Sequence, residues 1–231
     1  MSHGKQFTLY SHAGGGPNGW KVAFVLEELG LAYHPIYLDL AKNEQKSPDH
    51  TRFNPNGRIP TLIDHHNGDY VLWESDAIIL YLINKYDPAH KLSVTAETDK
   101  YDLIKWLFFQ ASGQGPYFGQ AFHFLRNHPG EKLPTAIARY QREIVRVWGV
   151  LDGVLAQSPG GWLVAGRMTA ADLAFFHWND AMLALNVLEG HPDGEVDFEK
   201  QFPAVHAWHE KMKALPTAKK LVADREAAKA T

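Results

Sequence analysis

Asn54-Pro55-Asn56-Gly57-Arg58-Ile59-Pro60-Thr61 (residues 54–61) is the stretch that decides the fold of the N-terminal part of this chain. It places Pro60 directly before an apolar strand candidate, Thr61-Leu62-Ile63. X-Pro bonds are the common site of cis peptides in folded proteins, and a cis proline in a loop is usually a specific feature of the fold. We therefore expect a cis peptide bond between Ile59 and Pro60.

The residues after this stretch predict a β-hairpin and a helix. Tyr70-Val71-Leu72-Trp73 is a further strand candidate, and Asn67-Gly68 before it is a turn signal. A link this short requires the two strands to be antiparallel. A helix follows, because four apolar residues recur on one helical face: Ile79, Leu82, Ile83 and Tyr86.

The residues before the stretch predict a βαβ unit. Residues 7–10 and 34–38 are strand candidates, and the helix between them has one apolar face, with Lys21 expected to face away from it. The order βαβ, then a link, then ββα, with a proline opening the third strand, is typical of a thioredoxin-like α/β domain. We expect this domain to occupy residues 1–88.

The remaining residues, 89–231, predict an all-α domain of about five helices. Gly113, Gly115 and Pro116 interrupt the first of them, so we expect a kink there. Thr169-Ala170-Ala171-Asp172 resembles a capping box that opens a strongly apolar helix. Residues 219–231 are rich in alanine and charge and are expected to fray.

Composition narrows the class of function. Among 231 residues there is no cysteine, which excludes disulfides, cysteine-based metal sites and a cysteine nucleophile. The net charge of −3 gives no electrostatic case for nucleic acid or an anionic membrane as partner. Neither a signal peptide nor an apolar run long enough for a membrane span is evident, so we expect a cytoplasmic protein.

Two other motifs are weaker. Residues 14–19 match the dinucleotide-binding pattern G-x-G-x-x-G, and Asp39 follows at a suitable distance. The predicted hairpin argues against it, because a doubly wound sheet needs parallel crossovers. His206 and His209, and the adjacent His65 and His66, suggest metal ligands, but no third ligand stands at a recognised spacing, so we expect no metal.

The segment Trp73-Glu74-Ser75-Asp76 predicts a site for an α-amino acid end group. Ser75 is expected at the start of a helix, as its N-cap, where backbone donors and the helix dipole favour a carboxylate. Glu74 beside it could hold an ammonium group. Ile59, before Pro60, could offer its backbone N–H and C=O to a peptide ligand as an added strand would. Together they predict a peptide-like ligand with a γ-linked glutamate.

The whole chain, over nearly all of residues 5–222, resembles a cytosolic glutathione transferase. Four segments carry the resemblance, and they are similar to the fungal subgroup related to the yeast nitrogen-regulatory prion protein and to the bacterial nu class: residues 17–22, 54–60, 73–75 and 108–113. The resemblance implies glutathione transferase architecture, a homodimer, a role in detoxification, and glutathione as cosubstrate.

The resemblance also implies residue roles. Asn18 would place its amide near the glutathione sulfur, Ile59 would pair with the cysteinyl unit, and Glu74 with Ser75 would hold the γ-glutamyl end. The other implied glutathione-binding positions are Gln45, Arg58 and Pro60. A thiol is only slightly ionised at neutral pH, and a helix start with hydrogen-bond donors can stabilise the thiolate. Asn18 has both, while Ser11 remains a competitor for this role.

An electrophile site is expected against the kinked helix, between the domains, lined by Phe109, Gly113, Tyr117, Phe118 and Phe122. The partners would be glutathione and a small hydrophobic electrophile, a peroxide or a disulfide. Two functions stay open: an enzyme that conjugates glutathione or reduces with it, and a non-catalytic binding or regulatory protein on the same fold. No Asn-rich segment precedes the first strand candidate, which favours the enzyme.

Overall fold

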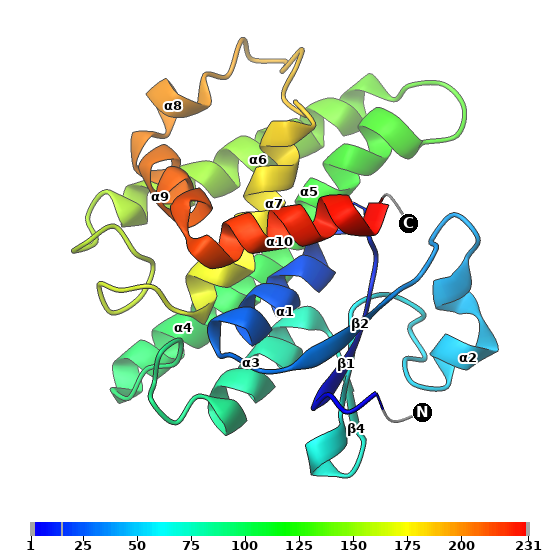
Figure 1. The fold of residues 1–231 in the computed structure, drawn as a ribbon. Coiled ribbons are helices and arrows are strands. Elements are labelled where there is room, and N and C mark those ends of the chain that lie inside the picture. Colours follow the sequence, from blue (N-terminus) through cyan, green and yellow to red (C-terminus); the bar gives the residue numbers. More distant parts are fainter. Residues whose placement is uncertain (1–2, 15, 230–231) are drawn as a thin grey trace. The chain divides into compact units, whose positions relative to one another are not determined.

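The computed structural model describes residues 3–14 and 16–229, and the chain divides into two compact units (Figure 1). One comprises Met1–Ser93 with Ala214–Thr231, and the other comprises Val94–Lys213. This division differs from the predicted boundary chiefly in the last helix, which groups with the N-terminal residues. Within the described residues, no helix is both long and apolar enough to span a membrane.

A four-stranded sheet organises the first unit. Its strands lie in the order β2 (Tyr33–Tyr37), β1 (Phe7–Ser11), β3 (Thr61–Asp64), β4 (Tyr70–Trp73). β1 pairs with β2 in parallel, and β3 pairs antiparallel with both β1 and β4. This confirms the βαβ-ββα prediction, including the hairpin. The dinucleotide alternative fails, because β1 and β2 form the one parallel pair among the described strands.

Two long helices, α1 (Pro17–Glu28) and α3 (Ser75–Tyr86), pack against each other and the sheet. Phe7 and Leu9 of β1 are buried with them, while the alternate residues Thr8 and Tyr10 face the opposite side, where α2 (Pro48–Thr51) lies. The expectation that the chain end frays is wrong for its described part. α10 (Pro216–Lys229) is helical and packs on α1, and Lys220 forms an ion pair with Glu27 at 2.8 Å.

The second unit is helical, as predicted. Its helices are α4 (Glu97–Phe109), α5 (Gly115–Phe122), α6 (Pro134–Leu155), α7 (Ala170–Ala184), α8 (Phe198–Gln201) and α9 (Pro203–Ala214). The predicted kink is confirmed as η3 (Gln110–Gln114), a π-helical turn between α4 and α5. A second π-helical turn, η4 (His123–Asn127), follows α5. Short 3₁₀ turns, η1 (Glu44–Lys46) and η2 (His65–Asn67), belong to the first unit.

The predicted capping box at the start of α7 is confirmed, and its aspartate also contacts residues outside the motif. The Asp172 carboxylate is fully buried and accepts bonds from the Thr169 backbone at 2.9 Å and the Leu163 backbone at 3.1 Å. It also accepts one from Trp208 Nε1 of α9 at 3.0 Å. Burial raises the pKa of this carboxyl to about 6. One side chain therefore joins a helix start, a preceding loop and a second helix.

His209 of α9 is a buried histidine in an aromatic setting. Its ring lies 5.1 Å from that of Phe176, and its Nδ1 has no hydrogen-bond partner among the described residues. The nearest acid, Asp180, is 3.8 Å from Nε2. Burial lowers the pKa of His209 to about 4, and the charge of Lys213 adds to this. Desolvation outweighs the weak attraction of Glu210, so the neutral ring is the stable form.

Replacing Asp172 by alanine should destabilise the second unit strongly. The change leaves buried backbone and indole donors without an acceptor, at a cost of about 4 kcal/mol in the free energy of unfolding. Asp172→Asn keeps one acceptor oxygen and should cost about half as much. Denaturant unfolding measures both. The exposed Asp102→Ala is the matched control and should change stability by less than about 0.5 kcal/mol; equal effects at 102 and 172 would contradict this account.

Although Asp172, whose pKa is raised on folding, acts in the opposite direction, His209 should lower the stability of the protein in mild acid. Its pKa is depressed on folding, so the unfolded state binds more protons between about pH 4 and pH 6.5, and acid favours unfolding. At pH 5 this linkage costs about 2 kcal/mol relative to pH 7. We expect His209→Leu to remove that part of the pH dependence, and the half-exposed His206→Gln to retain it. Parallel pH profiles for wild type and His209→Leu would refute the assignment.

Candidate functional site

The register of the sheet brings the predicted site residues of the first unit to one end. Tyr10 of β1 lies opposite Thr61 of β3, and Thr61 lies opposite Trp73 of β4. The next residues at this end are therefore Ser11, Pro60 and Glu74. Because α1 and α3 also begin here, after β1 and after β4, three loops and two helix starts meet at one edge.

The loop that carries Pro60 is held by a single buried side chain. The Asn54 amide donates to the Arg58 carbonyl at 2.8 Å and to Thr61 Oγ1 at 3.0 Å, and its Oδ1 accepts from the Asn56 backbone at 3.0 Å. The Ile59-Pro60 bond is cis, as predicted. Neither the N–H nor the C=O of Ile59 bonds to any other described residue. This backbone is thus available to a ligand.

Gln45 lies on η1, next to the same loop. Its Oε1 is buried without a hydrogen-bond partner among the described residues. Amide O and N are interchangeable by a flip of the side chain, so the buried atom can accept from a ligand or donate to one. Gly57, at φ 58°, comes close to the Gln45 carbonyl, and a Cβ there would lie 3.1 Å from it. Arg58 is exposed beside them.

The start of α1 lies against the end of β1. Asn18 is the second residue of the helix and is half-buried, in the place predicted for it. Ser11 is 3% exposed, and a Cβ on Gly19 would overlap its Oγ. Only glycine at residue 19 therefore allows this close approach. Gly16 comes near Ile59, since a Cβ there would lie 3.3 Å from Cδ1. Gly15, in the same loop, lies outside the described residues.

The start of α3 differs from the prediction. Ser75 was expected to be the N-cap, but Glu74 takes that position and Ser75 is the first helical residue. Glu74 has φ 69°, a left-handed conformation that costs a non-glycine residue on the order of 1 kcal/mol or more. The reason is that the chain must reverse directly from β4 into α3. Strained residues of this kind cluster at functional sites, and the Glu74 side chain is exposed here beside the buried Ser75.

A buried ion pair ties the two helix starts together. Lys21 of α1 is 1% exposed and its Nζ lies 2.9 Å from Asp76 Oδ1, in the first turn of α3. Burial lowers the pKa of Lys21 and raises that of Asp76, against the attraction between them. The expectation that Lys21 faces solvent is wrong, because its partner stands far away in the sequence. No local signal could have revealed this pair.

This end of the sheet has the properties of a receptor for a peptide-like anion. It offers a free backbone strand segment at Ile59, two helix starts with positive dipole ends, and the carboxylate of Glu74. The predicted residues Ser11, Asn18, Ile59, Pro60, Glu74 and Ser75 all lie there, with Gln45 and Arg58 on the adjoining loop. Sequence analysis did not identify Asn54 and Lys21, which hold the residues of this site in position.

The residues predicted to line an electrophile site belong to the second unit. Phe118 is fully buried with its ring edge-on to Trp148 and Trp178, so it is a core residue and lines no open wall. Gly113 is buried in η3, where a Cβ would meet the ring of Phe109 at 2.9 Å. The others are half-buried: Phe109, Tyr117 and Phe122.

The histidines considered as metal ligands are dispersed. His209 is enclosed by aromatic rings, while His65 bonds to Thr8 Oγ1 at 2.8 Å and to Asp69 at 2.5 Å. The part of the chain that the structure describes contains no group of three or more His, Cys, Asp or Glu residues placed to hold a metal ion.

Comparison with known families gives two matches. Residues 5–84 match the family described as "Glutathione S-transferase, N-terminal domain". Residues 120–225 match "Glutathione S-transferase, C-terminal domain".

Individual relatives agree with these matches. The chain is 49% identical to Glutathione S-transferase 1 of Schizosaccharomyces pombe, over 96% of this chain and 98% of that protein. It is 35% identical to the transcriptional regulator URE2 of Saccharomyces cerevisiae, over 91% of this chain and 66% of that protein. Among solved structures, Ure2p5 of Phanerochaete chrysosporium, cocrystallised with 1-(S-glutathionyl)-2,4-dinitrobenzene, superposes with a TM-score of 0.88 at 49% identity, covering 100% of this chain and 99% of that one.

Breaking the buried ion pair should destabilise the first unit. Asp76→Ala removes the carboxylate that faces the buried Lys21 ammonium, which should cost about 3–5 kcal/mol in the free energy of unfolding. The double variant Lys21→Met/Asp76→Leu removes both charges and should recover most of that loss. Lys42→Met, which breaks the exposed pair with Asp39, should cost less than about 1 kcal/mol. A double variant as unstable as Asp76→Ala would show that lost packing, not an unpaired charge, sets the cost.

Proposed function

Because the chain belongs to the glutathione S-transferase family, we propose that it binds glutathione, holds the thiol as thiolate and directs it at an electrophile. The observation that carries this is the unpaired backbone of Ile59 at the end of the sheet where α1 and α3 begin. Glutathione is a peptide with an α-amino acid end group. Its receptor therefore needs a strand-like backbone partner for the peptide and, beside it, a site for the end-group carboxylate.

In the proposed complex, Ile59 pairs with the cysteinyl unit in front of Pro60. The γ-glutamyl carboxylate accepts from Ser75 at the start of α3, and Glu74 takes the ammonium group. The glycyl carboxylate reaches Arg58 and the amide of Gln45, whose buried Oε1 position would turn to a donor by a side-chain flip. Each contact pairs an ionic group of the ligand with a complementary group of the chain.

We assign stabilisation of the thiolate to Asn18. Lowering the pKa of a thiol from about 8.5 to about 6.5 requires about 2.7 kcal/mol of preference for the anion. A hydrogen bond to a charged acceptor supplies about 1.5–3 kcal/mol, and a helix start adds up to about 1 kcal/mol. Asn18 combines both and is half-buried, whereas Ser11 is almost fully enclosed behind Gly19.

The proposed reaction is conjugation, with reduction of peroxides or disulfides as a further activity. The conjugate in the Phanerochaete chrysosporium relative supports conjugation, since it joins the glutathione sulfur to a dinitrophenyl ring. The family also leads us to propose a two-fold homodimer. The competing function is a binding or regulatory protein, which the similarity to a transcriptional regulator favours.

Asn18→Ala should abolish most of the bound thiolate. With glutathione at saturation and neutral pH, we expect the ultraviolet absorbance of the thiolate in wild type and a rise of about two units in the thiol pKa in the variant, since about 2.7 kcal/mol of stabilisation is lost. Ser11→Ala should keep the thiolate signal. Asn84→Ala, an exposed asparagine on α3, is the matched control.

The outcomes separate the possible functions. Equal thiolate in wild type and Asn18→Ala would transfer the role to Ser11 or to backbone donors. Rates with 1-chloro-2,4-dinitrobenzene, cumene hydroperoxide and a glutathione mixed disulfide distinguish conjugation from reduction. Tight glutathione binding with no turnover of any of the three would establish the binding protein instead.

A further inference from the structure

His12 stands directly after β1, at the end of the sheet where the candidate site lies. It follows Ser11, the last residue of β1, and precedes the loop that leads to Asn18 of α1. The Leu38 N–H donates to the Ser11 carbonyl at 2.9 Å, so the chain leaving β2 runs beside this position. The His12 side chain is half-buried. The proposed complex leaves this imidazole without a role.

One hydrogen bond fixes the tautomer of the His12 ring. Its Nδ1 lies 3.1 Å from the Leu38 carbonyl oxygen. A carbonyl oxygen only accepts, so Nδ1 must carry the proton of the neutral ring and donate it. Nε2 is then the basic nitrogen of the ring, and it bonds to no other described residue.

Two glycines leave room in front of the basic edge of this ring. A Cβ on Gly14 would lie 2.6 Å from Nε2, and a Cβ on Gly16 would lie 4.0 Å from Cδ2. A side chain at residue 14 would therefore press against Nε2 and cover it. Glycine at this position keeps the nitrogen open to a ligand atom.

The same ring lies near the backbone proposed to bind the cysteinyl unit. The Cβ that Gly16 lacks would lie 3.3 Å from Ile59 Cδ1 and 3.8 Å from His12 Cβ. The two side chains therefore approach each other across a residue that has none. Asn18 follows two residues after Gly16, so the imidazole, the free backbone of Ile59 and the amide lie at one corner of the sheet. A thiol on a cysteinyl unit paired with Ile59 would be held at this corner.

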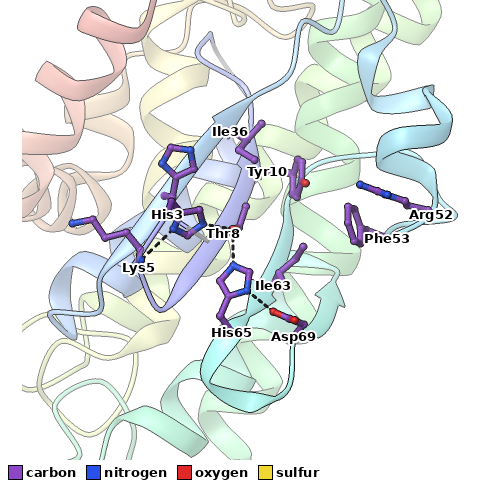
Figure 2. Close-up of a pocket in the computed structure, with 11 residues that line it drawn as sticks. His3, Lys5, Thr8, Tyr10, Ile36, Arg52, Phe53, Ile63, His65 and Asp69 are labelled. Carbon is purple, nitrogen blue, oxygen red and sulfur yellow. Dashed lines mark hydrogen bonds and ion pairs between the residues drawn. The ribbon is translucent and has the colours of Figure 1, made fainter. Parts of the chain in front are cut away.

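Other histidines of the first unit are already engaged. Figure 2 shows His3 and His65 on the face of the sheet opposite α1 and α3, where both bond to Thr8, at 2.7 Å and 2.8 Å. His50 bonds through Nδ1 to a backbone carbonyl at 2.9 Å and through Nε2 to the Thr61 hydroxyl at 3.1 Å. None of these three rings offers a free nitrogen to the candidate site.

The acids that follow Leu38 in the chain are engaged as well. Asp39 forms an ion pair with Lys42 at 3.1 Å, and Glu44 accepts from the Asp39 backbone at 2.8 Å. Among the residues that the structure describes, none forms an ion pair with His12. A thiolate bound at this corner would therefore be the first charged partner of the ring.

We propose that His12 is the general base that takes the proton of the glutathione thiol, a step that rests on the proposed function. Nε2 accepts the proton as the S–H bond breaks, and the electron pair of that bond stays on the sulfur. The imidazolium then stands beside the thiolate and stabilises it together with the Asn18 amide. When the sulfur pair bonds to the electrophile, the leaving group departs with its own pair and Nε2 releases the proton to water. Imidazole suits this step because it exchanges a proton near neutral pH.

The test counts the protons that enter the medium when glutathione binds at pH 7.5. Ultraviolet absorbance measures the thiolate formed, and a pH indicator in weak buffer measures the protons released. S-methylglutathione, which has no free thiol, gives the release caused by the rest of the ligand. A proton that stays on His12 does not reach the indicator. We expect wild type to release fewer than about 0.5 protons per thiolate formed, against about one where no group of the protein takes the proton.

His12→Asn removes the base and keeps the bond to Leu38, because the asparagine amide stands where Nδ1 stood. We expect this variant to release about one proton per thiolate formed. His66→Gln, on an exposed residue of η2, is the matched control and should behave as wild type. Near-ultraviolet circular dichroism checks folding, and His12→Gln decides the case if His12→Asn does not fold.

The outcomes of the proton count are distinct. A ratio of about one in wild type, or the same ratio in wild type and His12→Asn, would overturn the role of His12 while the thiolate signal leaves the proposed function standing. Absence of any thiolate in wild type would refute the proposed function, and this step with it.

The rate of thiolate formation supplies a second readout, which a purely structural role would not produce. In stopped-flow mixing, His12→Asn should form the thiolate at least about ten-fold more slowly than wild type. Added imidazole should restore much of that rate, because it takes the proton from solution. An unchanged rate, or a slower rate that imidazole does not restore, would contradict the assignment.

Discussion

The antiparallel pairing of β3 with both β1 and β4 is the constraint on which the candidate site depends. It fixes Tyr10, Thr61 and Trp73 in one row across the sheet, so the residues one step beyond must meet at one edge. A slip of the register by one residue would turn every side chain to the opposite face and separate Ile59 from Ser75. The geometry of the site is thus a consequence of strand pairing more than of any loop.

Two further interactions hold the residues of this sheet edge in position. The bonds of Asn54 shape the loop before Pro60, and the Lys21–Asp76 pair joins the starts of α1 and α3. Both are buried; the Asn54 bonds act within one loop, and the Lys21–Asp76 pair joins residues 55 positions apart. These interactions are present before a ligand binds. Groups that are already in place lose less conformational entropy when the ligand binds.

Local patterns predicted the fold well and the candidate site in part. Period-two and helical spacing identified β1, β3, α1 and α3, and the X-Pro bond identified the cis peptide at Ile59-Pro60. The features that were missed depend on distant partners or on backbone geometry. We expected Lys21 to be a surface charge because its partner, Asp76, is 55 residues away in the sequence. Glu74, and not Ser75, is the N-cap because β4 turns directly into α3.

The contact between Gly19 and Ser11 links two positions that a sequence would present as independent. A Cβ at residue 19 would lie 2.0 Å from Ser11 Oγ and 3.1 Å from Ser11 Cβ, so a γ-atom at position 11 requires glycine at residue 19, and loss of that γ-atom removes the worse of the two overlaps. The two positions must therefore vary as a pair, and the effect of a change at one is conditional on the other. In a library of variants, this coupling favours the order of changes in which residue 11 loses its hydroxyl before residue 19 gains a side chain.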